Sequence, residues 1–321
     1  MPKGKRYAKR TRRRPAWVGV LALLVVAAAG ILRYLGVDWN TLLPAGAGAP
    51  AASQTAPEGT LQVYYFDVGQ ADSELICLPT GEHILIDAGT SSTQEELVRQ
   101  LRSLGAETLD LVVATHPHAD HIGGMAAVLE ALTVEQIVMP VTSDSSTPTT
   151  QTYEALLDAI GEEGLTVTPA QAGEEIWNGG GASLQVLAPN AQSYGDLNDY
   201  SVVLRLVYGA DSFLFTGDAE ETSEEEMLSR GWTLNATVLK CGHHGSETST
   251  SQPFLDAVRP QYAVISCGVD NDYGHPDQVT LDRLEAAGAE VFRTDLQGTI
   301  VASTEGSGVT MTALGKGVEA G

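Results

Sequence analysis

Cysteine is nearly absent from this 321-residue sequence, which has only Cys77, Cys241 and Cys267 and no C-x-x-C pair. Three cysteines are too few for a disulfide framework, and an odd number cannot all pair. Cys241 and Cys267 could pair in an oxidising compartment, but each is more simply a small buried side chain in a β-rich stretch. We assign the cysteines no chemistry.

Basic residues are scarce in most of the chain. From Leu61 onward there are nine Lys and Arg against 39 Asp and Glu, a net charge of −30. So acidic a body repels polyanions at long range, which argues against a broad nucleic-acid-binding surface but not against a small metal-centred site. With 43% hydrophobic residues, 18% charged residues and 34 glycines, the composition is that of a globular protein.

The other nine basic residues lie before residue 34, and residues 1–15 form a basic tail. The tail is followed by residues 16–32, which carry no charge, and we interpret residues 16–37 as a transmembrane anchor. Positive charge stays cytoplasmic, so this predicts a single-pass cell-membrane protein with the rest of the chain extracytoplasmic. The alternative is a signal peptide cleaved near Ala29, which would give a secreted protein.

Residues 38–60 are rich in Ala, Pro, Gly, Ser and Thr and are predicted to be a flexible linker. Beyond them, strands and helices alternate, and we expect one domain over residues 61–315. Expected strands include residues 61–68, 72–78, 82–87, 109–114, 183–187, 201–208 and 212–216, with helices at 94–104, 153–163 and 219–230 and a last strand at 297–303. Two β-rich halves, each followed by helices, predict an α/β fold, a four-layered αβ/βα sandwich.

The strongest chemical signal is the segment THPHADHIGG, residues 115–124, which follows a predicted strand. It places four candidate metal ligands within six residues: His116, His118, Asp120 and His121. Imidazole and carboxylate together suit Zn²⁺ or Mn²⁺, and two such ions about 3.5–4 Å apart can hold a bridging hydroxide. The alternative is a polar turn that is rich in histidine. Six of the seven histidines, all except His83, fall in three short segments, and this clustering favours a metal site.

Two later strands also end in candidate ligands. Asp218 follows the apolar segment FLFTG, where a carboxylate can bridge two cations or, alternatively, cap the helix predicted at 219–230. The segment LKCGHHGS carries His243 and His244. We expect one of them, preferably His244, to complete the metal site and the other to orient it or contact substrate.

Four further residues receive supporting roles. Asp87 ends a buried strand and is predicted to orient the histidine segment. Lys240 is predicted to hold an anionic group, the alternative being an ordinary solvated lysine. His275 is a candidate general acid or phosphate contact, or else an exposed loop histidine. Ser246 is expected to support the site or contact substrate.

With these residues in place, the sequence resembles the metallo-β-lactamase superfamily, whose H-x-H-x-D-H signature is met in full by residues 116–121. More narrowly, residues 61–303 are similar to the hydrolase domain of the ComEC family of competence proteins. The matching segments are FDVGQADSELI, LIDAGT, THPHADHIGG, LNDYSVVLRLVYG, FLFTGD, LKCGHHGSETS and NDYGHP.

The resemblance implies a site for two divalent metal ions, Zn²⁺ or Mn²⁺, bridged by Asp218. The other implied ligands are His116 and His118 for one ion, and Asp120, His121 and either His244 or His243 for the second. The superfamily has a further histidine before Asp218, and this sequence has Asn198 and Asp199 in that stretch instead. Asn198, Asp199 or water would then supply an oxygen ligand, and such a site fits Mn²⁺ as well as Zn²⁺.

The function implied is a metal-dependent hydrolase, and we expect a phosphodiesterase or nuclease that uses a metal-bound hydroxide on a phosphodiester, DNA being one candidate. Asp120, Lys240 and His275 are its expected catalytic residues. Alternatives are a phosphocholine or wall-polymer esterase, a lactonase or a β-lactamase on the same metals. A tethered binding protein with a closed structural metal site fits the near-complete ligand set poorly. Expected partners are the competence or cell-wall machinery, which would have to supply any DNA channel.

Overall fold

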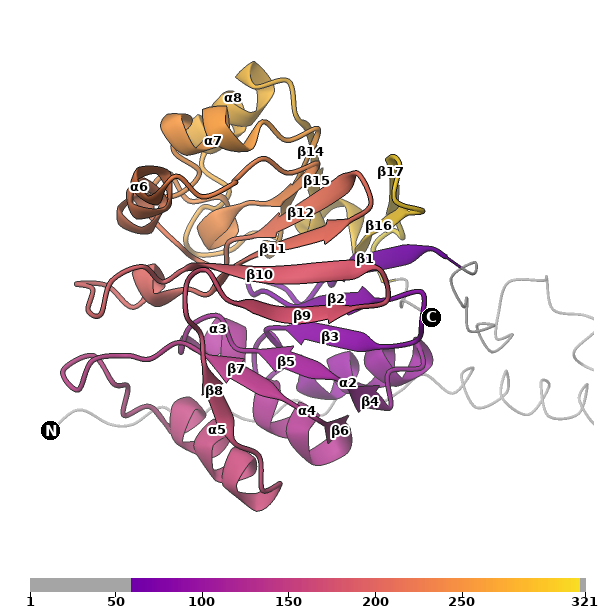
Figure 1. Cartoon of the computed structure of the whole chain (residues 1–321), viewed down its shortest axis with the longest axis vertical. Coiled ribbons are helices and arrows are strands. Elements are labelled where there is room, and N and C mark those ends of the chain that lie inside the picture. Colours follow the sequence, from indigo (N-terminus) through magenta and orange to yellow (C-terminus); the bar gives the residue numbers. More distant parts are fainter. Residues whose placement is uncertain (1–58, 318–321) are drawn as a thin grey trace, which may run out of the picture. The chain divides into compact units, whose positions relative to one another are not determined.

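Successive side chains of a β-strand point to opposite faces, and in this protein both faces are apolar. In strand β1 (Leu61–Tyr65), Leu61, Val63 and Tyr65 belong to one buried cluster and Tyr64 belongs to another. A strand of this kind needs apolar cover on both sides. The computed structural model, which describes residues 59–317, provides that cover with two sheets and two sets of helices (Figure 1).

Two large sheets carry most of the strands. The eight-stranded sheet has the order β17 (Val309–Ala313), β16 (Ile300–Thr304), β1, β2 (Glu74–Cys77), β3 (His83–Ile86), β5 (Leu111–Val113), β7 (Ile137–Met139) and β8 (Val167–Pro169). The seven-stranded sheet has the order β15 (Glu290–Arg293), β14 (Tyr262–Ile265), β13 (Val238–Lys240), β12 (Asp211–Phe215), β11 (Val203–Tyr208), β10 (Ala182–Ala188) and β9 (Glu175–Gly179). Strands β4 (Thr108–Leu109) and β6 (Thr133–Val134) form a separate pair.

Three apolar clusters hold the layers together. One lies between the eight-stranded sheet and helices α2 (Gln94–Ser103), α4 (Met125–Ala131) and α5 (Gln151–Glu162). A second fills the space between the two sheets, where the rings of Tyr65 and Phe215 stack 6.1 Å apart. The third lies between the seven-stranded sheet and helices α6 (Glu221–Arg230), α7 (Gln252–Val258) and α8 (Gln278–Ala286). The predicted four-layered αβ/βα sandwich is therefore confirmed.

Parallel strands position the loops that matter for function. Strands β3 and β5 are parallel, as are β12, β13 and β14. Loops after parallel strands emerge at one edge of a sheet, which is where α/β folds place their ligand sites. The short elements in these loops are α3 (Ala119–Ile122), the 3₁₀ turn η3 (Gly242–Gly245) and α9 (Thr294–Gln297) after β15. A further 3₁₀ turn, η2 (Asn198–Tyr200), lies between the antiparallel strands β10 and β11.

Two glycines let the loop after β5 pack tightly against the loop after β3. A Cβ on Gly124 would lie 2.3 Å from the carbonyl oxygen of Ala88, and one on Gly123 would lie 2.7 Å from the backbone nitrogen of Ser91. No side chain fits at those distances. The pair Gly123-Gly124 at the end of the THPHADHIGG segment is thus a packing requirement.

The structure extends the predicted order in one place. Regular structure does not close at residue 303, because β17 pairs with β16 along the edge of the eight-stranded sheet. Strand β17 buries only Val309 among its five residues, so its sequence has no apolar alternation by which it could be recognised.

Several predictions concern residues outside the described part of the chain. The basic tail 1–15, the anchor 16–37 and nearly all of the linker 38–60 fall there. Within residues 59–317 no helix has the length and apolar character needed to span a bilayer. Cys77, Cys241 and Cys267 are all free thiols.

Candidate metal centre

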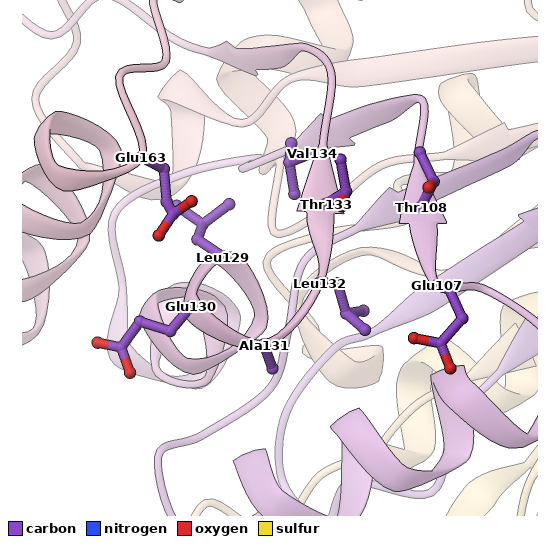
Figure 2. A pocket seen from close by; sticks show the side chains of 9 residues that line it. All are labelled: Glu107, Thr108, Leu129, Glu130, Ala131, Leu132, Thr133, Val134 and Glu163. Atoms are coloured by element: carbon purple, nitrogen blue, oxygen red, sulfur yellow. The ribbon is translucent and has the colours of Figure 1, made fainter.

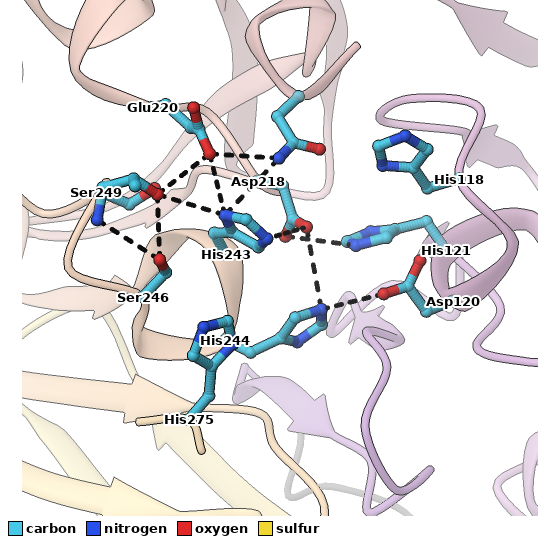
Figure 3. A network of polar contacts seen from close by, with 12 residues as sticks. His118, Asp120, His121, Asp218, Glu220, His243, His244, Ser246, Ser249 and His275 are labelled. Atoms are coloured by element: carbon cyan, nitrogen blue, oxygen red, sulfur yellow. Dashed lines mark hydrogen bonds and ion pairs between the residues drawn. The ribbon is translucent and has the colours of Figure 1, made fainter. Parts of the chain in front are cut away.

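Six histidines from three loops meet at one edge of the sandwich. His116, His118 and His121 follow β5, His243 and His244 follow β13, and His275 follows β14. Figure 3 shows the rings of His118, His121, His243, His244 and His275 gathered around Asp218, which follows β12. The three histidine segments that are separate in the sequence therefore form one site.

Asp218 lies among four imidazoles. Its Oδ1 is 3.2 Å from Nε2 of His121, and its Oδ2 is 3.7, 3.8 and 3.9 Å from Nε2 of His244, His243 and His116. Burial alone would raise the pKa of this carboxyl, but His121 and His244 outweigh that effect and hold the pKa well below its usual range. The carboxylate faces the histidines and makes no cap for α6, which removes the alternative of a helix cap.

The residues around Asp218 fit a divalent cation. Asp120, His121, Asp218 and His244 each offer one ligand atom, and these four atoms all lie within 4.8 Å of one another. Among the described residues, Nε2 of His121 and Oδ1 of Asp218 are buried and have no hydrogen-bond partner. Buried polar atoms without a partner are costly, and a cation between them would satisfy both. Two imidazoles and two carboxylates suit Zn²⁺ or Mn²⁺.

His116 and His118 form the other half of the centre. Nε2 of His116 lies 3.0 Å from Nδ1 of His118, so both nitrogens face one small space. His116 is 1% exposed, and burial, with the neighbouring His121 ring, places its pKa well below the usual range. A neutral imidazole is the form that binds metals.

Asp87 orients His121, as the sequence predicts. Its Oδ2 lies 2.6 Å from Nδ1 of His121 and accepts a 2.6 Å hydrogen bond from the Thr115 hydroxyl, while its Oδ1 accepts one from the Thr115 amide. Asp87 has φ of 56°, a left-handed backbone that is strained for a residue with a side chain. With Nδ1 engaged, Nε2 of His121 is directed at Asp218.

His243 and His244 both reach Asp218, so the structure brings together the two residues between which the sequence could not choose. Both have left-handed backbones, with φ of 48° and 53°, and this turn directs both Nε2 atoms inward. His244 is fully buried, and its Nδ1 lies 2.9 Å from the Ser266 carbonyl. His243 is partly exposed, and its Nδ1 lies 3.0 Å from Glu220. Sequence reasoning missed Glu220, which sits in an ordinary acidic run.

Asn198 and Asp199 separate into different roles. Oδ1 of Asp199 accepts hydrogen bonds from the amides of Glu220 and Ser223, so this carboxylate caps helix α6 and is not the oxygen ligand we expected. Asn198 lines the cavity above the histidines, and its Oδ1 is buried without a hydrogen-bond partner in residues 59–317. Asn198 therefore has the free oxygen that the site requires.

Lys240 is not placed where a substrate could touch it, so its expected role is wrong. It is 1% exposed, and its Nζ lies 2.6 Å from Oδ2 of Asp72 and 3.0 Å from the Cys241 carbonyl. Oδ1 of the same Asp72 lies 3.3 Å from Nδ1 of His244. The ion pair thus supports His244 from inside. Asp72 was missed because its partner lies 168 residues away in the sequence.

His275 and Ser246 lie at the outer side of the centre. The His275 ring is 5.4 Å from the His243 ring, and its side chain is 10% exposed. Ser246 bonds Thr248, which in turn donates to Glu220, so Ser246 supports the group that holds His243.

A cavity of about 350 Å³ opens onto the centre. Its lining residues are Gln70, His118, Ala119, Asp120, Asn198, Asp218, His243, His244, Tyr273 and His275. None of these is Lys or Arg, so no fixed cation of the described chain faces a bound anion. A separate hollow beside β4 and β6 is lined by Glu107, Glu130 and Glu163 with apolar and threonine side chains but no histidine (Figure 2).

Comparison with known proteins gives a consistent result. The family model of the metallo-β-lactamase superfamily matches residues 66–269. Competence protein ComA of Neisseria gonorrhoeae is 34% identical over 286 residues, which are 87% of this chain and 38% of that protein. ComE operon protein 3 of Bacillus subtilis is 33% identical over 256 residues, 74% of this chain and 32% of that protein. The chain thus spans about a third of the length of these relatives.

A solved structure shares the fold at low sequence identity. CmlA, a diiron β-hydroxylase from Streptomyces venezuelae, aligns with a TM-score of 0.51 and 15% identity, covering 81% of this chain and 55% of that one. At 15% identity this similarity indicates a shared fold and nothing about activity.

The buried ion pair gives a first prediction. Lys240→Met leaves Asp72 buried without its counter-ion, and we expect it to lower the free energy of unfolding by about 3–5 kcal/mol. The control is Lys316→Met, which removes the more exposed pair with Asp67 and should cost at most about 1 kcal/mol. Urea unfolding of the metal-free protein measures both. An equal loss of unfolding free energy in the two variants would show that the buried Lys240–Asp72 pair does not stabilise the fold.

Cation binding should release protons. Burial opposes the charged form of His244, but Asp218 and Asp72 outweigh it and raise its pKa to about 10. The metal-free protein therefore carries a proton on His244 at neutral pH, and a cation must displace it. The pKa of His121 is also raised well above its usual value, since Asp218 and Asp87 outweigh the effect of burial. We therefore expect at least one proton to be released when an ion binds these histidines at pH 7, with affinity falling as the pH is lowered.

Calorimetric titration of Zn²⁺ in buffers of different ionisation enthalpy counts the released protons. His244→Gln should reduce that release by about one proton and weaken binding, with His121 supplying the release that remains. Zn²⁺ binding without proton release in the unsubstituted protein would contradict the protonated state assigned to His244.

Proposed function

The chain belongs to the metallo-β-lactamase superfamily, and from this premise we propose that residues 61–315 are a metal-dependent phosphodiesterase acting on nucleic acid. The observation that carries the proposal is the buried Asp218 carboxylate with four imidazole nitrogens within 3.9 Å. The homologous competence proteins support nucleic acid as the substrate class. A catalytic role, as opposed to a structural one, is supported by the cavity that opens directly onto the ligands.

We assign two cation positions. Asp120, His121 and His244 would hold one ion, His116, His118 and the Asn198 oxygen the other, and Asp218 both. Bound divalent cations would supply Lewis acidity, an activated water and compensation of charge on a phosphoryl group. Asp120 is about a third exposed at its side chain, lies 3.3 Å from His244 and lines the cavity.

His275 is the residue best placed to handle a proton. It lines the cavity, and its Nδ1 has no hydrogen-bond partner among the described residues. Burial and the neighbouring His243 and His244 lower the pKa of His275, which keeps the ring neutral at neutral pH. A neutral imidazole can donate one hydrogen bond to a phosphate oxygen and accept another, which suits a general acid–base group.

Charge limits the size of the substrate footprint. The body from Leu61 onward carries a net charge of −30, and no Lys or Arg lines the cavity. A long phosphate backbone would gain nothing from this surface and would be repelled by it. The enzyme is therefore proposed to act on a short stretch or an end, and added salt should change its KM little.

The location and partners belong to the same proposal. With residues 16–37 as an anchor, the hydrolase domain is held at the outer face of the cell membrane, where incoming DNA is met. Competence machinery is the proposed partner, because the matched relatives are competence proteins, of which this chain covers about a third.

The experiment uses the full chain, purified metal-free in mild detergent and reconstituted with Mn²⁺ or Zn²⁺. End-labelled single- and double-stranded DNA should be cleaved only with metal. His118→Ala should lose at least roughly 10²-fold in kcat/KM, since even residues behind metal ligands cost that much. His83→Ala is the matched control, because His83 lies in β3 outside the centre, and it should stay active.

Three other results separate the alternatives. Inactivity on DNA with metal-dependent hydrolysis of bis-p-nitrophenyl phosphate would replace nucleic acid with a small or wall-derived phosphodiester, such as a phosphocholine ester. Hydrolysis of lactones or β-lactams alone would replace phosphodiesters altogether. Tight metal binding with no hydrolysis of any of these substrates would refute the proposal that the metal centre is catalytic.

A further inference from the structure

An exposed aromatic ring stands at the mouth of the metal cavity. Tyr273 is 72% exposed, the most exposed of the large apolar side chains in residues 59–317 and the one aromatic ring among them. It lines the same cavity as His118, Asp120 and Asp218. Exposing a ring has a solvation cost, and the metal centre makes no use of Tyr273.

A series of rings leads from Tyr273 to the metal ligands. The Tyr273 and His275 rings stack with centroids 5.7 Å apart and planes 23° apart. His275 in turn packs edge to face on His243 at 5.4 Å, and Nε2 of His243 lies 3.8 Å from Asp218. A group lying against Tyr273 is thus directly beside the groups that would hold a phosphate.

Hydrogen bonds fix the conformation of the loop that carries Tyr273. The Asn271 side chain donates to the carbonyls of Gly268 and His275 at 2.9 and 2.6 Å and accepts a bond from the His275 amide at 3.0 Å. Gly268 also donates to Gln70 at 2.9 Å, which ties this loop to the opposite rim of the cavity. A ring held in place before binding loses little conformational entropy when a ligand stacks on it.

The side chains that line the cavity favour contacts to a nucleobase over contacts to further phosphates. Without Lys or Arg in the lining, backbone phosphates beyond the scissile one find no cationic partner. Stacking on an aromatic ring contributes about 1–3 kcal/mol per base and tolerates any base. A nucleobase can therefore gain binding free energy by stacking on Tyr273, whereas the phosphates are repelled by the acidic surface.

We propose that Tyr273 stacks on the nucleobase next to the scissile phosphate and so makes the site select nucleotide phosphodiesters over phosphodiesters that lack a base. This rests on the phosphodiesterase function proposed above. A base inside a duplex is already stacked on its neighbours and cannot lie on Tyr273. The preferred substrates are therefore single strands and frayed ends.

The test compares two esters with the same leaving group, thymidine 5′-(p-nitrophenyl phosphate) and its analogue with 1,2-dideoxyribose, which lacks only the base. With the full chain and Mn²⁺, kcat/KM should favour the thymidine ester by roughly tenfold or more. Tyr273→Leu, which keeps apolar bulk without a ring, should bring this ratio close to one. Tyr273→Trp should keep or increase it.

A control and three outcomes complete the design. Leu296→Ala removes a side chain that is 64% exposed and does not line the cavity, and it should keep the ratio of the unsubstituted protein. A ratio near one in the unsubstituted protein, or one that survives Tyr273→Leu, would overturn the stacking role while leaving the phosphodiesterase intact. Hydrolysis of neither ester with either metal would instead bring down the phosphodiesterase and the stacking role together.

Discussion

The centre depends on one buried ion pair between Asp72 and Lys240. Asp72 follows β1 of the eight-stranded sheet, Lys240 ends β13 of the seven-stranded sheet, and their 2.6 Å contact joins the two sheets beneath the histidines. Lys240 is the one lysine or arginine that is buried in residues 59–317, while Asp72, Asp87 and Asp218 are all buried around the centre. So many carboxylates are tolerated without solvent only when cations or hydrogen bonds compensate them. Lys240 compensates one of them permanently, which leaves Asp218 available to bound metals.

Sequence reasoning worked where the information is local. The H-x-H-x-D-H spacing places ligands within six residues after one strand, and two β-rich halves, each followed by helices, indicate a layered sandwich. Both the histidine segment and the fold could therefore be predicted. It failed where a side chain's direction depends on distant packing. Lys240 looks like a free cation beside a loop until Asp72 is brought against it, and Asp199 looks like a ligand until α6 presents its amides. The choice between His243 and His244 was undecidable from spacing because a left-handed turn directs both inward.

Buried residues orient the metal ligands, and a different set of residues at the cavity mouth contacts substrate. Behind the ligands, Asp87, Asp72 and Glu220 each hold one imidazole nitrogen, so the ring faces are fixed before any cation arrives. At the mouth, Gln70 and Tyr273 line the cavity without being candidate metal ligands. A protein built in this way can change its substrate by changing the rim while the ligands stay fixed, which is how one superfamily fold carries many hydrolytic activities.

The pairing of β1 with β16 has a consequence for how the protein is made. Leu61 lies opposite Thr304 in this register, so the central sheet stays incomplete until the last part of the chain has arrived. Contacts this far apart in sequence form late in folding. We expect metal uptake to follow synthesis, in the compartment where these C-terminal strands fold. The ion that fills the centre is decided by the metal supply of that compartment as much as by the ligands themselves.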